Sequence, residues 1–482
     1  MTMFLLSAGA LLTLGAPFNH GAVLQRDMKI PVWGTSVTGE TVTISFGEQR
    51  VEAKVTPDGR WRAELAPMPA CGEGRTLRVG NSLRSIVLYD VLVGEVWLCA
   101  GQSNMEQPLG LGGNGWADKN GAIEARLTDE TDIRYLSSGG KFAATPQETV
   151  PDGNGTWRTF TSESLVRFPN IPYHFAMNLR RGLKGVPIGL LHASCGGSKI
   201  QPWISAEGYA AVPELDDLRK AGRLVGADTP EAKGIGYWTL IAQPTVFFNG
   251  KIAPLAAYPF RGVVWYQGES NVADGDRYRL YLHALVRGWR KAFGREEMDF
   301  YIVQPTPHLY KNRRETVLGE LWTAQQKFVA EDGHAAYVVS DDSGVLNEEH
   351  SPYKRDIGLR IALCALNRQY GRTDLEYRSP QLKSARTRGG VVTLEFRFAS
   401  FLYTPAIAGP VRNFELAGAD GVWHPAEGKI ESGRVSVWSD AVADPVKVRY
   451  MYRLGMQGDL YARGTNLMPG AFVAEVEAME KK

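Results

Sequence analysis

The sequence offers little that could form a metal site or a disulfide framework. Only four of its 482 residues are cysteine, and none stands in a CxxC pair or at the spacing of a Cys/His zinc site. We therefore expect no metal and no cofactor, with the cysteines buried as small apolar side chains. Cys99 and Cys195 each come near the end of a predicted strand, and a bridge between them stays open.

A large excess of charge and a long apolar run are also missing. The formal net charge is +2, which favours neither nucleic acid nor an anionic membrane as a partner. No apolar run approaches the roughly 20 residues of a membrane helix, so we expect no membrane span. The stretch MTMFLLSAGALLTLGAPF resembles the apolar part of a signal peptide but lacks Lys and Arg. Export and a cytoplasmic location both stay open, as does the oligomeric state.

What the sequence does contain is a middle segment of one kind between two ends of another. Residues 1–88 and 376–482 are rich in short β-prone runs separated by Gly, Pro, Asp and Asn, which is typical of β-sandwich-like modules. Residues 89–375 alternate nearly continuous apolar runs with helical patterns. This alternation predicts an α/β domain of three layers, α/β/α, with a parallel sheet.

Polar residues and glycines follow the predicted strands of the middle segment. Ligands bind beyond the carboxyl ends of the strands in such sheets. Four of these strand ends carry Gly101 to Asn104, Ser194 to Ser198, Gln267 to Asn271 and Asp341 to Ser343, and His350 follows soon after the last. We expect any chemistry to lie among these segments.

Ser103 is the candidate nucleophile. It follows the run VWLCAG at a strand-to-helix turn, where a serine hydroxyl can meet a base and its N–H can face an oxyanion. The GxSxG elbow of α/β-hydrolases is absent, because Met105 stands where the second glycine belongs. A serine that merely caps the following helix explains the local sequence equally well.

His350 is the candidate base. Of the eight histidines, only His350 follows a core strand in a polar loop with adjacent carboxylates, and Ser351-Pro352 favours a helix start that would hold its ring. The acid that orients the ring is predicted to be Glu348. The alternatives are Glu349, Asp341 and Asp342, each of which an ordinary solvated acidic loop would also explain.

Stabilising an oxyanion requires hydrogen-bond donors from more than one strand end. The candidates are the N–H of Ser103, the N–H of Gly196 or Gly197, and the side-chain amide of Gln267. Each has an ordinary structural explanation as well, because glycines form tight turns and a glutamine amide can close a loop.

These blocks together resemble the sialate O-acetylesterase family, carbohydrate esterases of the SGNH (GDSL-like) hydrolase superfamily. The resemblance covers nearly the whole chain, and GQSNME together with WYQGESN is its most specific part. It implies an SGNH-type domain with Ser103 as nucleophile and His350 as base. The family usually has DIHP where this chain has EEHS, so the assignment of Glu348 as the acid stays open. The motifs that carry the resemblance are AVLQRDMKIPVWG, VGEVWLCAGQSNME, NGKIAPL, WYQGESN and DLYARGTNLMPGAF.

The same motifs supply candidate substrate-binding residues, namely Gln102, Asn104, Glu269, Asn271 and Trp203. Trp203 lies in GGSKIQPW, where its ring would either stack on a sugar or belong to the core. The loops 109–121 and RFPNIPYH are expected to line the pocket.

The resemblance implies a metal-free serine esterase that removes O-acetyl groups from sialic acid through an acetyl-enzyme. An acetyl-xylan or general acetyl-polysaccharide esterase is the nearest alternative. The β-rich ends and the twelve tryptophans also allow a carbohydrate-binding protein with an inactive site. A glycosidase with paired carboxylates, either Glu269 with Asp274 or Glu348 with Glu349, is the weakest alternative, because side chains that are neighbours in sequence rarely face each other across a sugar ring.

Overall fold

The computed structural model describes residues 12–111, 116–139, 141–150, 155–227, 229–405 and 410–479. Most of the apolar N-terminal stretch and part of the predicted pocket loop 109–121 therefore lie outside the described residues. Within the described ranges, no helix has the length and apolar character needed to cross a membrane.

The N-terminal module consists mainly of antiparallel strands, and β1 is the exception because it pairs in parallel with β7. In β5 (Arg60–Leu65), buried residues alternate strictly with exposed ones, as expected for a strand covered on one face. β5 pairs with β2, while β3 pairs with β4 and β6, which gives the predicted β-sandwich-like arrangement. The remaining bounds are β1 (Val23–Gln25), β2 (Ile30–Thr35), β3 (Thr41–Phe46), β4 (Gln49–Lys54) and β6 (Cys71–Gly80).

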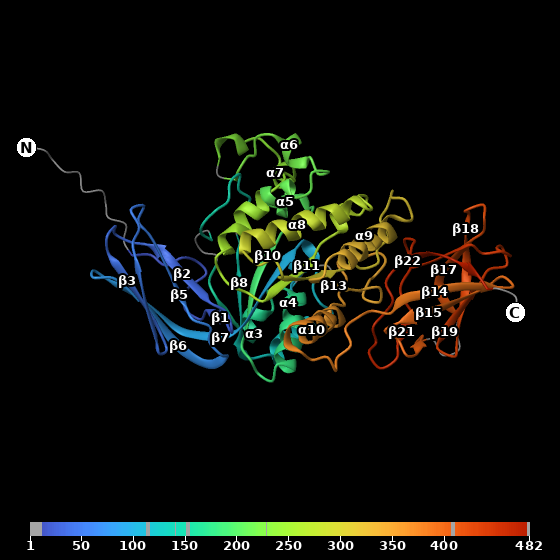
Figure 1. Cartoon of the computed structure of the whole chain (residues 1–482), viewed down its shortest axis with the longest axis horizontal. Coiled ribbons are helices and arrows are strands. Elements are labelled where there is room, and N and C mark those ends of the chain that lie inside the picture. Colours follow the sequence, from blue (N-terminus) through green and yellow to red (C-terminus); the bar gives the residue numbers. More distant parts are fainter. Residues whose placement is uncertain are drawn as a thin grey trace, which may run out of the picture.

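One long strand, β7 (Ser85–Gly101), joins this module to the middle of the chain (Figure 1). Its first half pairs with β6 in antiparallel fashion, and its second half, from Glu95 onward, pairs in parallel with β10 (Ile188–Ser194). The predicted division at residue 88 falls inside this continuous strand.

The middle of the chain is built on a parallel sheet with strand order β13-β12-β11-β7-β10-β8-β9. The edge strand β9 is antiparallel to its neighbour β8. Every residue of β11 and β12 is buried, which accounts for the continuous apolar runs in the sequence. The strands not yet bounded are β8 (Glu130–Ser137), β9 (Arg158–Phe160), β11 (Gly262–Tyr266), β12 (Asp299–Val303) and β13 (Ala335–Val338).

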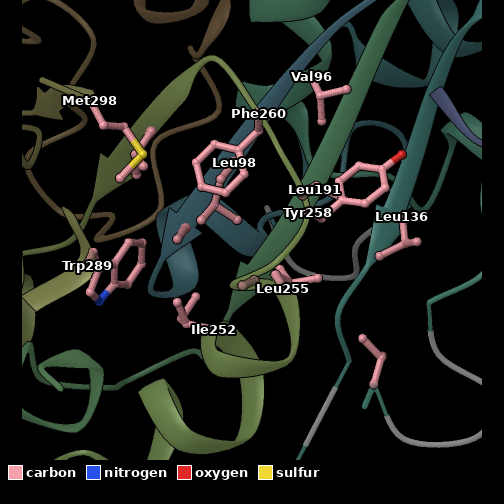
Figure 2. Packing of buried hydrophobic residues seen from close by; sticks show 14 of the residues in the cluster. Val96, Leu98, Leu136, Leu191, Ile252, Leu255, Tyr258, Phe260, Trp289 and Met298 are labelled. Carbon is pink, nitrogen blue, oxygen red and sulfur yellow. The ribbon is translucent and has the colours of Figure 1, made fainter. Parts of the chain in front are cut away.

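Helices cover both faces of this sheet. Val96 and Leu98 of β7 belong to one core with Trp289 of α8 (Arg277–Phe293), as Figure 2 shows, whereas Trp97 and Cys99 belong to a second core with α4 and α10. α9 (Val317–Glu331) lies beside α8, and α4 (Asn170–Gly182) packs on α10 (Arg355–Tyr370). The predicted three-layer α/β/α domain is confirmed. The short helices are α1 (Ser103–Glu106), α2 (Gly121–Leu127), α3 (Ser162–Leu165), α5 (Ala206–Ala210), α6 (Asp217–Ala221) and α7 (Tyr237–Ile241).

The C-terminal module is a single curled sheet with strand order β22-β20-β17-β18-β19-β15-β14-β23. β22 (Phe472–Glu475) and β23 (Glu477–Ala478) lie at opposite ends of this order although only Val476 separates them, so the sheet turns back on itself and resembles a barrel. The predicted β-rich module is confirmed, but its form is not that of a two-layer sandwich. The other strands are β14 (Gln381–Arg388), β15 (Val391–Arg397), β17 (Val411–Ala417), β18 (Trp423–Glu431), β19 (Arg434–Trp438) and β20 (Lys447–Tyr450), with β16 (Leu402–Tyr403) paired separately to β21 (Tyr461–Ala462).

Candidate active site

Gly101 brings three strand ends together at the carboxyl edge of the sheet. A Cβ at this position would lie 2.0 Å from the carbonyl oxygen of Tyr266, so any other residue would force β7 and β11 apart. The same carbonyl accepts a hydrogen bond from the N–H of Gln102 at 3.1 Å, and the N–H of Cys195 donates to the carbonyl of Gly101 at 3.1 Å. The turn is therefore fixed by its backbone on both sides.

Ser103 is the first residue of α1, directly after this turn. Gln102 is the N-cap residue of α1, and its side chain makes no capping hydrogen bond among the described residues, so the structure excludes the capping explanation for Ser103. The N–H groups of a helix's first turn have no acceptor within the helix. Gly196 lies alongside, because a Cβ built on it would be 3.5 Å from the Cβ of Ser103.

The N–H of Gly196 already holds an anionic oxygen. It donates to Oε2 of Glu106 at 2.7 Å, and Glu106 itself is exposed to solvent. A substrate oxygen at this N–H would have to displace that carboxylate. Of the two glycines predicted as donors, Gly196 is thus the one whose N–H is directed to an anion beside Ser103.

The side chain of Gln267 links residues that follow three different strands, β7, β10 and β11. Its Nε2 lies within hydrogen-bond distance of three acceptors: Oε1 of Gln102 at 3.0 Å, the carbonyl of Ser198 at 3.2 Å and Oδ1 of Asn271 at 2.8 Å. Tyr278 donates its hydroxyl to Oε1 of Gln267 at 2.7 Å, and the side chain of Gln267 has no exposed surface. Its role as an oxyanion donor stays a prediction, and its observed role is to close the loop.

The polar residues of the motifs GQSNME and WYQGESN form a buried hydrogen-bonded framework around Ser103. Each of the four predicted substrate-binding residues from these motifs is at most 4% exposed, and each hydrogen-bonds to a neighbouring side chain. Their contact with substrate stays a prediction, and their observed role is to hold the strand ends together. These residues are Gln102, Asn104, Glu269 and Asn271.

Trp203 also belongs to the core. Its ring has no exposed surface, and its Nε1 donates to Oγ of Ser198 at 3.1 Å. The prediction that this ring stacks on a sugar is wrong, because substrate cannot reach it.

A buried lysine that the sequence did not reveal lies behind Ser103. Nζ of Lys354 donates to Oδ1 of Asn104 at 2.6 Å and to the hydroxyl of Tyr266 at 3.3 Å. Asn104 in turn donates its Nδ2 to Oε1 of Glu269 at 2.5 Å. Burial lowers the pKa of Lys354 to about 7 and raises the pKa of Glu269 above its ordinary value. A lysine at a helix start carries no sequence signal for such burial.

The loop that carries His350 is bonded to α1. Asn104 donates to the carbonyl of Glu349 at 3.1 Å, and Gln107 donates to the carbonyl of His350 at 3.5 Å. The ring of Trp116 meets the imidazole edge-on, with 4.3 Å between centroids. Burial, together with the nearby Lys354, lowers the pKa of His350 to about 4. The imidazole is thus neutral near pH 7, and its buried Nε2 has no hydrogen-bond partner within the described ranges.

None of the predicted acids hydrogen-bonds to His350 among the residues that the structure describes. Glu348 and Glu349 are exposed. Asp342 is paired with Arg360 at 2.7 Å. Asp341 has no exposed surface and accepts a hydrogen bond from Gln304, and burial raises its pKa to about 7. The identity of the acid stays a prediction.

The cysteines near the site are free. Cys99 and Cys195 are both buried and unbridged, which answers the question that the sequence left open. Among the described residues, no group of three or more His, Cys, Asp and Glu side chains has the arrangement of a metal site.

Comparison with known proteins decides the family. The family model described as "Carbohydrate esterase, sialic acid-specific acetylesterase" matches residues 93–362, which is more than half of the chain. This chain belongs to that family. The family resemblance expected from the sequence is thereby confirmed, and the chain is a carboxylic-ester hydrolase that acts as a carbohydrate O-acetylesterase.

Similar proteins from this family cover most of the chain. The sialate O-acetylesterase of Homo sapiens is 26% identical over 411 residues, which are 78% of this chain and 74% of that protein. The protein of the same name from Rattus norvegicus is 26% identical over 409 residues, or 74% of this chain and 73% of that one. A carbohydrate acetylesterase from Xanthomonas citri, of known structure, is 32% identical with a TM-score of 0.84, covering 96% of this chain and 99% of that chain.

Proposed function

We propose that this carbohydrate esterase removes acetyl groups from sugar hydroxyls by serine catalysis at Ser103. The observation that carries the proposal is the position of Ser103, at the first turn of α1 and beside a glycine N–H that already binds a carboxylate oxygen. Two donors, the N–H of Ser103 and the N–H of Gly196, would hold the acyl oxygen as it gains negative charge.

In the proposed reaction, Oγ of Ser103 attacks the carbonyl carbon of the acetyl group while His350 takes the hydroxyl proton. The tetrahedral intermediate collapses, the bond to the sugar oxygen breaks, and His350 gives its proton to that oxygen. A water molecule, deprotonated by His350, then attacks the acetyl-enzyme. Acetate leaves, and the proton returns to Ser103.

The sugar we propose first is O-acetylated sialic acid, because the family model and the human and rat relatives carry that substrate in their names. The Xanthomonas citri protein is described only as a carbohydrate acetylesterase, which leaves acetylated xylan as the second candidate. The test is acetate release by the wild-type chain from 9-O-acetylated sialic acid and from acetylated xylan. Faster release from xylan would overturn the first choice of sugar.

The pH dependence of kcat/KM is expected to show an acidic limb near pH 4. His350 must be neutral to take the proton of Ser103, and burial holds its pKa at about 4. Activity is therefore present above this pH and lost as the pH falls through it. Circular dichroism at each pH controls for unfolding. This profile reports the free enzyme, in which no carboxylate among the described residues bonds to the imidazole. A limb at pH 6.5 or above would contradict this expectation and would indicate that a carboxylate reaches the imidazole before substrate binds.

Glu348 is the acid that we retain. Among the described residues its carboxylate makes no hydrogen bond, whereas Asp342 is held by Arg360 and Asp341 is buried against Gln304. Glu348 is therefore free to turn toward His350, as is the equally exposed Glu349. Glu348 is retained because it stands two residues before the histidine, where the family pattern DIHP has its aspartate. Replacing it with glutamine is expected to lower kcat by about 10²–10⁴-fold.

The amide variants Glu349→Gln, Asp341→Asn and Asp342→Asn form the comparison set for this prediction. Their melting temperatures separate a loss of activity from a loss of fold. If an aspartate variant that remains folded has the lowest kcat while Glu348→Gln stays near wild type, the acid is that aspartate.

A further inference from the structure

Two exposed aromatic side chains lie at the start of α7, close to the glycine turn of residues 195–197 that follows β10. Tyr237 is 54% exposed and Trp238 is 65% exposed. Their rings meet edge to face with 5.5 Å between centroids. Tryptophan and tyrosine usually bury most of their surface, so an adjacent pair open to solvent marks a contact surface.

Both aromatic side chains contact the turn of residues 195–197. A Cβ built on Gly197 would lie 2.7 Å from Cζ3 of Trp238, and Gly197 has a φ of +70°, so only glycine lets the indole lie against the turn. The hydroxyl of Tyr237 is 3.6 Å from Sγ of Cys195. Cys195 and Gly197 flank Gly196, which lies beside Ser103 and whose N–H donates to Oε2 of Glu106.

We infer that Trp238, with Tyr237 packed edge to face against it, forms an aromatic platform for the sugar ring that carries the acetyl group. The inference rests on the proposed function. One face of a pyranose presents C–H groups, which pack on an aromatic ring, while its hydroxyls stay in water. The indole contacts Gly197, which is the neighbour of Gly196 in the chain. A sugar on the platform would therefore lie close to the N–H of Gly196, which would hold its acyl oxygen.

The platform replaces Trp203 as the aromatic group that binds the sugar. Trp203 is enclosed by the core, whereas the Trp238 ring is accessible beside the same glycine turn. No local pattern distinguishes Trp238 in the sequence, because its contact with Gly197 joins segments about 40 residues apart and is made by folding alone.

The test compares two substrates with one variant. For Trp238→Ala, KM for the acetylated sugar is expected to rise about tenfold, the order expected for loss of an aromatic contact. The kcat/KM for ethyl acetate, which has no ring to stack, is expected to stay within about twofold of wild type. Trp238→Phe should restore part of the loss. Phe401→Ala serves as the matched control, because Phe401 is 58% exposed and lies in the C-terminal module.

Binding separates this inference from the proposed chemistry. Titration of acetylated sugar into Ser103→Ala and into Ser103→Ala/Trp238→Ala measures the platform without turnover. Weaker binding by the double variant supports the platform even if Ser103 proves not to be the nucleophile. Equal binding by the two overturns it, as does an equal loss on ethyl acetate and sugar. A lower molecular mass of Trp238→Ala in solution would also overturn it, since a second copy would then cover this face.

Discussion

Replacing Ser103 with alanine is expected to lower kcat for acetate release by about 10³–10⁶-fold, the range seen when a nucleophile is removed from a serine hydrolase. The substitution removes the hydroxyl alone, and within the described part of the chain Oγ of Ser103 makes no hydrogen bond. The backbone contacts of the turn stay in place because they involve only main-chain groups and Gly101. We therefore expect a change in unfolding free energy within about 1 kcal/mol.

Ser198→Ala is the matched control, since Ser198 is also a buried serine at a strand end. Its hydroxyl donates to the carbonyl of Cys195 at 2.8 Å and accepts from Trp203 at 3.1 Å. Its removal is expected to cost about 1–3 kcal/mol of stability by leaving those groups unpaired. Activity measured well below its melting temperature should fall far less than in Ser103→Ala.

Acetate release and mass spectrometry together decide the role of Ser103. An acetyl group trapped on the peptide that contains Ser103 would be direct support for the acyl-enzyme. Turnover by Ser103→Ala within tenfold of wild type would rule out the mechanism.

Replacing Lys354 with methionine is expected to cost about 3–5 kcal/mol of unfolding free energy, because it leaves one member of a buried charge pair without its partner. Lys354 has no exposed surface and reaches Glu269 through the side chain of Asn104. Without the ammonium, the carboxylate of Glu269 stays buried at 4% exposure with no cation to offset it among the described residues around it. Urea unfolding at pH 6, below the lowered pKa of Lys354, measures the loss.

The second substitution and the pH dependence make this prediction specific. Lys354→Met combined with Glu269→Gln should recover much of the stability, since no uncompensated charge is left. In Lys354→Met alone, the deficit should be smaller at pH 4 than at pH 6, because Lys354 of the wild type is charged at both pH values. A carboxyl whose folded-state pKa is raised gains stability when it is protonated and loses it as the pH rises. A loss below about 1 kcal/mol, or one that is independent of pH, would show that Lys354 and Glu269 are not coupled in this way.

The sequence predicted the layers and the position of Ser103 because both depend on local patterns. The continuous apolar run from Val96 to Ala100 has the pattern of a strand covered on both faces, and Gly101 marks where that strand turns. The closure of the C-terminal sheet was beyond such reasoning. It depends on the pairing of Arg386 with Glu477, residues far apart in the chain whose contact leaves no periodic trace.

The polar motifs show most clearly which features the sequence alone could not predict. Gln102, Asn104 and Asn271 have the composition of a substrate-binding surface, yet Gln102 and Asn271 accept hydrogen bonds from Gln267, and Asn104 donates to Glu269. The hydrogen-bond partner of each amide depends on how three strand ends come together in space. The spacing of residues within one strand does not determine this arrangement. The burial of Lys354 and the exposure of Trp238 were hidden for the same reason.

The strand β7 also determines how the molecule loses its structure. One half of β7 bonds to the N-terminal sheet and the other half to the catalytic sheet. If either sheet unfolds, β7 loses hydrogen-bond partners on that half while the other half stays paired. Such sharing favours a single cooperative melting event for the two parts. A chain shortened to begin at residue 85 would expose the unpaired first half of β7, a free edge prone to aggregation. The N-terminal module thus pairs with the first half of the strand that leads to Ser103 and keeps that edge from being exposed.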